Sequence, residues 1–482
     1  MWGRRFGGIL IAFVAATGVI TSVAGGDTTA DGVLGQSNFA DNAPNQPGGL
    51  PTSTNLALSN AAHLAVSPDG RIYVSDPDNH RVLSWPTARL LADGAPADMV
   101  IGQPDFVSAV PNNGGLGPSS LFLPQGVWVD DEGNLWVADA FNNRVMKFNN
   151  PLTDASPGAA DLVIGQPDFV HADANLGGGF TGVDVATAQS ILFPGRVVVS
   201  GDDVWVADAG NSRVLHYTNP TTNLPAADLV LGQFGDFNCR VKNNDGTCSE
   251  KFGDVASADN LFNPIGLALS ASGALYVADW NNHRVLRFDD VLTTDTTADA
   301  VYGQPDLDSN APDNGGTASG LELPIDVIVN GAGDLLVADS GNNRVLVYLD
   351  AVANGSPDRV FGQLGSLTAS DVNHGLGFFV TDADGLFGPT GVALDFAGNV
   401  YVADTNNSRV LRYDVPINRL GDLNCDEVVD LTDVQPFVLA VVDEAAYEAA
   451  FPGCTSSLAD MNQDGRIDAA DVQQFILLLT NG

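Results

Sequence analysis

Two short stretches near the end of the 482-residue chain place oxygen-bearing side chains at the spacing that surrounds a calcium ion. In GDLNCDEVVDLTDVQPFVLAV and ADMNQDGRIDAADVQQFILLL, Asp, Asn, Asp, Asp and Asp stand at positions 1, 3, 5, 9 and 12. Oxygens at this spacing, with the backbone carbonyl at position 7, can wrap one Ca²⁺ ion. The predicted ligands are Asp422, Asn424, Asp426, Val428, Asp430 and Asp433 in the first loop and Asp460, Asn462, Asp464, Arg466, Asp468 and Asp471 in the second.

An apolar helix is predicted after each loop, and the two loops begin 38 residues apart. This arrangement resembles a type I dockerin, with Asp at position 12 where an EF-hand has Glu. The resemblance covers residues 419–482 and implies a small all-α domain that binds two Ca²⁺ ions and docks onto a cohesin-like protein. Its partner-contacting positions, which lack the usual Ser-Thr pairs, are Leu431, Thr432, Ala469 and Ala470.

The first calcium loop departs from the pattern at one position. Glu427 occupies position 6, where Gly normally makes the sharp turn. We therefore expect the first site to be strained or weaker than the second. Each loop also gathers four carboxylates, which repel one another when no cation is bound, so the domain is expected to loosen without calcium.

A second set of polar side chains recurs along the rest of the chain. The stretch VADAFNNRVMKF, residues 137–148, contains Asp139, Asn142 and Arg144, and this trio appears in six copies. Lys never replaces the Arg, which suits a planar guanidinium that holds a carboxylate. The trio could be a binding site or part of the scaffold; because catalytic sites break symmetry, we interpret it as a fastener. Its Asp residues are Asp76, Asp139, Asp208, Asp279, Asp339 and Asp404.

Each trio lies in a unit that predicts four short antiparallel strands. Two apolar runs flank a Gly-Asn turn in LPQGVWVDDEGNLWVAD, a third begins at the trio Arg, and a fourth ends in Gly-Gln, as in DLVIGQ. Six such units predict an all-β, six-bladed β-propeller over residues 27–418. The first Gly-Gln run, residues 32–36, precedes any first strand, so we predict that it completes the sixth blade and latches the ring.

The motifs Pro-x-Gly-Val, Val-Ala-Asp and Asn-x-Arg-Val resemble those of NHL-repeat propellers over about residues 30–415. The resemblance implies the fold but no single activity, because such propellers include protein-binding, RNA-binding and enzymatic members. These units are longer than ordinary NHL repeats, and the extra residues lie between each Gly-Gln and the next first strand. The long loops are expected on one face, where they either hold a ligand or partner or only pack on each other.

An enzymatic propeller, of the lyase or lactonase type, is the alternative that the resemblance leaves open. Only His80 and His283 occupy the same position of two units, and these units lie on opposite sides of the ring, too far apart to share a zinc ion. No Ser or Cys lies in a nucleophile motif, so no catalytic residue is predicted. The chain has six His residues: His63, His80, His171, His216, His283 and His374.

Charge and the N-terminus restrict the partners and the compartment. The formal charge of −39 disfavours nucleic acid as a ligand. Residues 1–24 predict a secretory signal peptide, because Arg4 and Arg5 precede about 15 apolar residues, fewer than the roughly 20 that span a bilayer. A retained membrane anchor and twin-Arg export are the alternatives. After cleavage no membrane span is expected.

Export would permit disulfides, and the four Cys residues form two pairs that are close in the sequence. Cys239 with Cys248 and Cys425 with Cys454 are the expected bonds, with free thiols as the alternative.

The sequence as a whole predicts a secreted or cell-surface, non-catalytic binding or scaffold protein. It would hold an unknown ligand on its long loops and be tethered by the dockerin-like module. The runner-up is an extracellular lyase or lactonase, which a metal at the propeller axis would favour.

Overall fold

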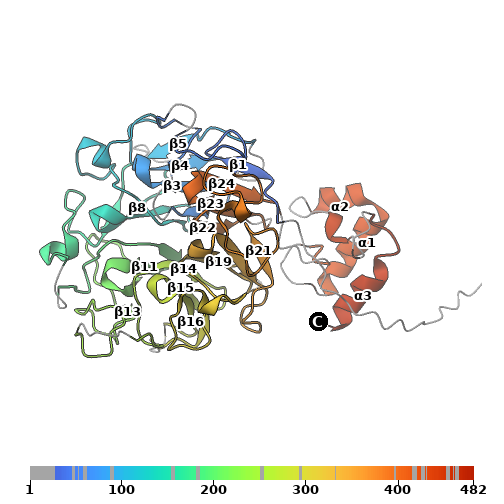
Figure 1. Cartoon of the computed structure of the whole chain (residues 1–482). Coiled ribbons are helices and arrows are strands. Elements are labelled where there is room, and N and C mark those ends of the chain that lie inside the picture. Colours follow the sequence, from blue (N-terminus) through green and yellow to red (C-terminus); the bar gives the residue numbers. More distant parts are fainter. Residues whose placement is uncertain are drawn as a thin grey trace, which may run out of the picture.

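The computed structural model describes residues 28–45, 49–52, 54–57, 62–86, 92–152, 158–180, 185–249, 255–292, 296–331, 333–395, 398–414, 421–424, 429, 431–451, 456–459, 461 and 466–481. The predicted signal peptide and both Cys425 and Cys454 lie outside these residues. Within them, the strands form six four-stranded antiparallel sheets arranged as the blades of a propeller (Figure 1). No helix of this described part is both long and apolar enough to cross a membrane.

The first three blades follow the predicted order of strands, each pairing with the next along the chain. Blade 1 contains β2 (Leu64–Val66), β3 (Ile72–Asp76), β4 (Arg81–Trp85) and β5 (Met99–Ile101). Blade 2 contains β6 (Val127–Val129), β7 (Leu135–Asp139), β8 (Arg144–Phe148) and β9 (Leu162–Ile164). Blade 3 contains β10 (Val197–Ser200), β11 (Asp203–Asp208), β12 (Arg213–Thr218) and β13 (Leu229–Leu231).

The last three blades repeat this plan, and the sixth is closed by the N-terminal strand. Blade 4 contains β14 (Pro264–Leu269), β15 (Leu275–Asp279), β16 (Arg284–Phe288) and β17 (Ala300–Tyr302). Blade 5 contains β18 (Pro324–Val329), β19 (Leu335–Asp339), β20 (Arg344–Tyr348) and β21 (Arg359–Phe361). Blade 6 contains β22 (Pro389–Leu394), β23 (Val400–Asp404), β24 (Arg409–Tyr413) and, paired with β24, β1 (Gly32–Leu34). The predicted latch is confirmed.

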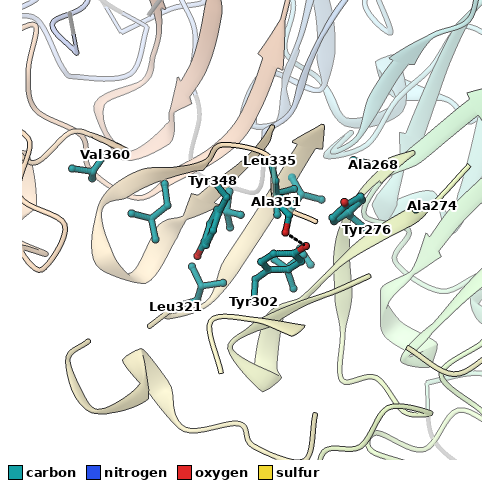
Figure 2. Close-up of a cluster of buried hydrophobic side chains, with 14 residues drawn as sticks. Ala268, Ala274, Tyr276, Tyr302, Leu321, Leu335, Tyr348, Ala351 and Val360 are labelled. Atoms are coloured by element: carbon teal, nitrogen blue, oxygen red, sulfur yellow. Dashed lines mark hydrogen bonds between the residues drawn. The ribbon is translucent and has the colours of Figure 1, made fainter. Parts of the chain in front are cut away.

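The strands are apolar on both faces because each blade packs between two others. Between blades 4 and 5, for example, Tyr276, Tyr302 and Tyr348 lie in one buried cluster (Figure 2). The Tyr302 and Tyr348 ring centroids are 5.5 Å apart, and the Tyr302 hydroxyl donates to the backbone oxygen of Ala351 at 2.9 Å. Burying a large side chain contributes about 1.5–3 kcal/mol. The core is therefore a ring of separate clusters between the blades.

A single 3₁₀ turn joins the second and third strands of every blade. These turns are η1 (Pro77–Asn79), η4 (Ala140–Asn142), η6 (Ala209–Asn211), η7 (Trp280–Asn282), η9 (Ser340–Asn342) and η11 (Thr405–Asn407). The connections from each fourth strand to the next first strand emerge at the same end of the sheets. This end is called the long-loop face below. Its loops contain η3 (Pro111–Gly114), η5 (Ala174–Gly177), η8 (Pro312–Gly315) and η10 (Val372–Gly375).

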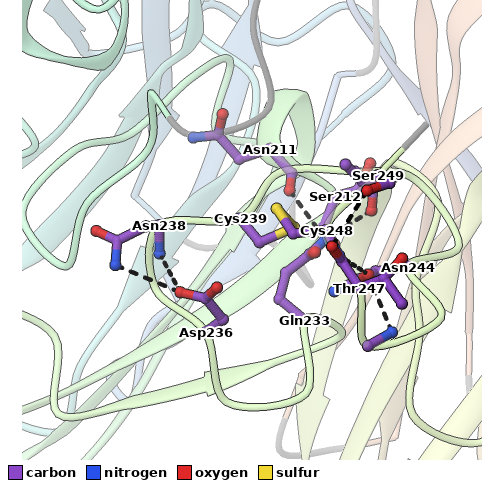
Figure 3. The surroundings of a disulfide bond; sticks show 12 residues. Asn211, Ser212, Gln233, Asp236, Asn238, Cys239, Asn244, Thr247, Cys248 and Ser249 are labelled. Carbon is purple, nitrogen blue, oxygen red and sulfur yellow. Dashed lines mark hydrogen bonds between the residues drawn. A yellow bond between two sulfur atoms is a disulfide. The ribbon is translucent and has the colours of Figure 1, made fainter.

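One long loop carries a disulfide. Cys239 and Cys248 are bonded, with their Cα atoms 5.6 Å apart, in the loop between blades 3 and 4 (Figure 3). The prediction of this pair from its spacing is confirmed. Nearby turns are held by side chains, since Asn244 Oδ1 accepts the backbone N–H groups of Gly246 and Cys248.

The described residues after position 420 form helices around a hydrophobic cluster of their own. They comprise η12 (Leu431–Asp433), α1 (Val434–Val442), α2 (Glu444–Ala450), η13 (Ser456–Ala459) and α3 (Val472–Asn481). The helices α1 and α3 begin directly after Asp433 and Asp471, where the sequence predicts them. Phe437 and Phe475, each four residues after that Asp, stack with ring centroids 4.0 Å apart. The duplicated sequence thus packs its two equivalent aromatic rings against each other.

Candidate functional site

The trio of blade 2 shows what the repeated Asp, Asn and Arg do. Asp139 Oδ2 accepts Nε–H of Arg144 at 2.8 Å and Nδ2–H of Asn142 at 2.7 Å. Its Oδ1 accepts the backbone N–H of Phe122, in the segment that enters the same blade, at 2.7 Å. The same three contacts occur in all six blades. The carboxylate is therefore fully engaged within its own blade.

The trio Arg ties the loops of its blade together. Arg144 donates from Nη2 to the backbone oxygen of Ser120, before the first strand, and from Nη1 to that of Phe169, after the fourth strand. Asp139 and Arg144 are both 0% exposed, so no ligand reaches them. Burial raises the pKa of the trio carboxyls, to about 6 for Asp339, and the paired guanidinium opposes the rise. The trio is a structural fastener, as the sequence interpretation proposes.

The trio Asn anchors the long loops. Asn142 and Asn112 exchange amide hydrogen bonds, Nδ2 to Oδ1, at 2.7 and 3.1 Å. The equivalent loop residue has a left-handed backbone in every blade, which an Asn or Asp side chain tolerates. These loop residues are Asn45, Asn112, Asn175, Asn243, Asp313 and Asn373. The bases of the long loops are thus fixed to the blades, whatever their tips contact.

His80 and His283, the histidines at equivalent positions, join neighbouring blades. Each histidine follows the trio Asn and has a left-handed backbone. His80 Nδ1 accepts the backbone N–H of Leu123 at 3.3 Å, and His283 Nδ1 accepts that of Leu323 at 3.2 Å, in both cases from the segment that enters the next blade. Asn143 performs the same task with Oδ1, accepting the N–H of Phe193 at 3.2 Å. These imidazoles are therefore structural acceptors.

These two contacts predict that the stability of the propeller depends on pH, because an Nδ1 that carries a proton cannot accept a hydrogen bond. Burial lowers the pKa of both rings below 6.5, so their contribution to stability is present above pH 6.5 and is lost as pH falls through the folded-state pKa. The double variant H80N/H283N, which uses the residue the chain has at position 143, should lose less stability on acidification than wild type. Urea unfolding at a series of pH values measures this. A difference in stability between the two proteins that is constant with pH would contradict it.

The axis of the propeller holds three ionisable side chains that the sequence reading did not bring together. His63 and Arg196 precede the first strands of blades 1 and 3, and Asp326 lies in the first strand of blade 5. Arg196 Nη1 lies 2.9 Å from His63 Nδ1 and 3.1 Å from Asp326 Oδ2, and the latter two atoms are 3.4 Å apart. Alternate blades are not neighbours, so such contacts exist only at the axis. We call these residues the axial triad.

Glycines in the intervening blades make room for the axial triad. Gly126, Gly266 and Gly391 occupy the equivalent position in blades 2, 4 and 6. A Cβ on Gly126 would lie 2.4 Å from the backbone oxygen of Gly195, and one on Gly391 would lie 2.6 Å from that of Ala62. The chain therefore alternates charged or polar side chains with Gly around its central ring.

Contacts within the axial triad decide what chemistry it can perform. Because an Arg N–H always donates, His63 Nδ1 accepts, and the neutral ring carries its proton on Nε2. Burial lowers the pKa of His63, consistent with this neutral form. Burial alone would raise the pKa of Asp326, but the positive charge of Arg196 holds that pKa below its usual range. All three residues are at most 1% exposed, so the triad closes the axis and is out of reach of a substrate.

The comparisons with known proteins agree with the propeller. The NHL repeat matches residues 263–288, 321–348 and 388–413, which cover the first three strands of blades 4, 5 and 6. The body of the chain is a six-bladed β-propeller with NHL repeats. Among curated proteins, it is 26% identical to Teneurin-3 of Danio rerio over 321 residues, 62% of this chain and 11% of that protein. It is 27% identical to NHL repeat-containing protein 3 of Homo sapiens over 145 residues, 27% of this chain and 37% of that protein.

The chain thus spans well under two thirds of the length of these relatives. Among solved structures, a streptogramin B lyase is 11% identical with a TM-score of 0.41, covering 78% of this chain and 96% of that one. A gluconolactonase of Xanthomonas campestris, XC5397, is 15% identical with a TM-score of 0.40, covering 80% and 98%. At this identity nothing about activity is transferred.

The predicted calcium loops lie partly within the described residues. Asp422, Asn424, Asp433, Arg466, Asp468 and Asp471 are described, whereas Asp426, Val428, Asp430, Asp460, Asn462 and Asp464 are not. In the first loop, Asp433 Oδ1 accepts the backbone N–H groups of Leu423 and Asn424 at 2.7 and 3.0 Å, which brings position 12 back to positions 2 and 3. Asp422, Asp433 and Asp471 are buried. Among the described residues no group of three or more His, Cys, Asp or Glu side chains could hold a metal ion, and calcium ligation by these loops stays a prediction.

Proposed function

We propose that this protein is an exported, non-catalytic binding scaffold. The propeller would present its long-loop face to a ligand or partner, and the C-terminal residues would act as a calcium-dependent, dockerin-like docking module with two Ca²⁺ ions. The Cys239–Cys248 bond supports export, since disulfides persist in oxidising compartments. The signal peptide and the cohesin-like nature of the docking partner are expectations of the sequence.

The observation that carries the docking proposal is a pair of equivalent apolar stripes on the C-terminal helices. Val434, Val438 and Val442 of α1 are 38%, 54% and 77% exposed, and Val472 and Ile476 of α3 are 36% and 52% exposed. A spacing of four residues places each set along one side of its helix. Val434 and Val472 both follow position 12 of a calcium loop, and Val438 and Ile476 lie one turn later. Exposed apolar rows of this kind support a protein partner.

The positions that the dockerin resemblance assigns to recognition lie beside these stripes. Leu431 is 80% exposed, and Thr432, Ala469 and Ala470 are also exposed. Thr432 Oγ1 accepts Nδ2–H of Asn424 at 2.7 Å, which joins a recognition position to the first calcium loop. This contact supports a docking surface whose shape depends on bound calcium.

The test uses the native complex that contains the protein, isolated with calcium present. Removal of residues 419–482 should release the propeller, and so should the double variant V438D/I476D, because each Asp would have to be desolvated against an apolar partner surface. The control V352D changes a Val that is 66% exposed, more than Val438 or Ile476, at the end of blade 5 opposite the long-loop face. Co-purification measures attachment, and unchanged attachment of the truncated protein would refute the tether.

The enzymatic alternative lacks a candidate centre in the described part of the chain. Besides the axial triad and the two interblade histidines, His171 pairs with Asp168 at 2.6 Å and His374 with Asp382 at 3.0 Å. His216 lies between Asp203 and Asp228, at 2.9 and 2.5 Å. Each of the six histidines therefore has a local partner, and the lyase or lactonase reading stays an untested prediction.

A further inference from the structure

The long-loop face carries one segment whose side chains point into solvent although they are strongly apolar. In residues 374–382, between blades 5 and 6, Leu376, Phe378, Phe379 and Val380 are 42%, 62%, 91% and 54% exposed. We call this segment the apolar finger. Four large apolar residues in a span of five are unusual for a free surface, where such residues are normally scattered singly.

The base of the apolar finger is built to hold the tip in place. His374 Nε2 lies 3.0 Å from both carboxylate oxygens of Asp382, joining the two ends of the segment. Thr381 Oγ1 donates to Asn373 Oδ1 at 3.2 Å and accepts from Arg409 Nη2 at 2.7 Å, which fixes the finger to the trio of blade 6. The exposed tip is therefore presented by a fixed base.

The turn of the finger also has a defined shape. Asn373 Nδ2 donates to the backbone oxygen of Gly377 at 3.0 Å, and Gly375 and Gly377 have φ values of 99° and 85°. Phe378 rests edge-on against Phe387, 5.3 Å between ring centroids, whereas Phe379 has no such ring contact among the described residues. Phe379 is consequently the most exposed large apolar side chain of the described chain.

Charge indicates what covers the finger. Residues 362–388 contain three Asp and neither Lys nor Arg, and the whole chain has a formal charge of −39. A second copy of this chain or an anionic lipid surface would be repelled. A positively charged protein surface would be attracted to the same acidic surroundings, and its apolar pocket would remove Phe379 from water.

We propose that the apolar finger is the main contact of the propeller with a basic protein partner, and that Phe379 inserts into an apolar pocket on that partner. This inference rests on the proposed function of the long-loop face and identifies the loop and the chemistry involved. Aromatic anchors in desolvated pockets dominate protein interfaces, and the rim charges mainly speed association.

The test pans a phage-displayed random peptide library on the full-length protein with calcium present, and the variant F378S/F379S/V380S is then compared with wild type. Enriched sequences are made as fluorescent peptides and titrated by polarisation. We expect peptides rich in Lys and Arg with one or more large apolar residues. Their affinity should fall at least tenfold for the triple variant and also weaken with salt. The control variant L292S/V352S alters two residues that are 58% and 66% exposed, at the end of blades 4 and 5 opposite the long-loop face, and should bind as wild type does.

Other outcomes separate the proposals. The finger proposal would be overturned by peptides that bind the triple variant as tightly as wild type but lose affinity for F180S, in the loop between blades 2 and 3. That result would keep the long-loop face as a binding surface. If no peptide is enriched on wild type, the result counts against both the apolar finger and the long-loop face as binding surfaces. Neutral phosphatidylcholine vesicles are the final probe, and sedimentation with them that depends on Phe378 and Phe379 would replace the protein partner with a lipid one.

Discussion

Replacing Arg196 with Met should destabilise the propeller by about 3–5 kcal/mol. Met retains much of the length of the side chain but removes the only cation that contacts Asp326 in the axial triad. Asp326 is fully buried, so in the variant its carboxylate would either keep a buried charge with no counter-charge or bind a proton and become neutral. Guanidinium unfolding, followed by tryptophan fluorescence, measures the loss.

A second substitution tests whether the loss comes from the buried charge and not from altered packing. In R196M/D326L both charges are gone, and the double variant should recover most of the stability that R196M loses, because an apolar pair of similar volume tolerates burial. The variant D326L alone should be destabilised, since Arg196 then keeps an unpaired charge. If R196M loses less than about 1 kcal/mol, as an exposed ion pair would, the axis is open to water and the closed triad is wrong.

The fold could be predicted from the sequence because its most regular feature is also its fastener. The trio sits at the hairpin between the second and third strands of every blade, where Asp139 pairs with Arg144 across the sheet. Counting trios therefore counts blades. The latch was also predictable, because a lone fourth strand at residues 32–36 had only the sixth blade to complete.

The axial triad shows what a search for repeats overlooks. Aligning the first strands places His63, Gly126, Arg196, Gly266, Asp326 and Gly391 at one position, so the signal was present in the sequence. A repeat motif does not reveal it, because the motif contains the residues that every unit shares, whereas these residues differ between units. That His63 contacts Arg196, 133 residues away, follows only once the ring is known to be closed.

The apolar finger could not be found from sequence at all. A run such as GLGFFV reads equally well as a buried strand, and only its position beyond the fixed base makes it exposed. The histidines illustrate the converse. The sequence shows that His80 and His283 occupy equivalent positions, but their role as acceptors for the next blade depends on a left-handed turn that Asn and Ser provide in the other blades.

Removing calcium should unfold the C-terminal residues while the propeller stays folded. Asp433 and Asp471 are 0% exposed and Asp422 is 7% exposed, so without a cation their negative charges stay in buried positions. At a calcium concentration about 100 times the dissociation constant, binding stabilises the folded module by about 2.7 kcal/mol, about a hundredfold in its folded-to-unfolded ratio. Proteolysis of the full chain, with and without chelator, should show cleavage after residue 420 accelerating by about that factor.

The two loops should respond differently, which makes this prediction specific to calcium ligation. Glu427 stands at position 6 of the first loop, where Gly stands in the second as Gly465. The variant E427G should therefore raise the affinity of the first site, because Gly adopts the turn without strain. The opposite variant, G465E, should lower the affinity of the second site for calcium. Calorimetric titration with Ca²⁺ resolves the two sites, and Mg²⁺ should not substitute, since it demands octahedral geometry and releases water reluctantly. If chelation leaves proteolysis after residue 420 unchanged, the carboxylates at positions 1 to 12 are a structural acidic cluster that needs no ion.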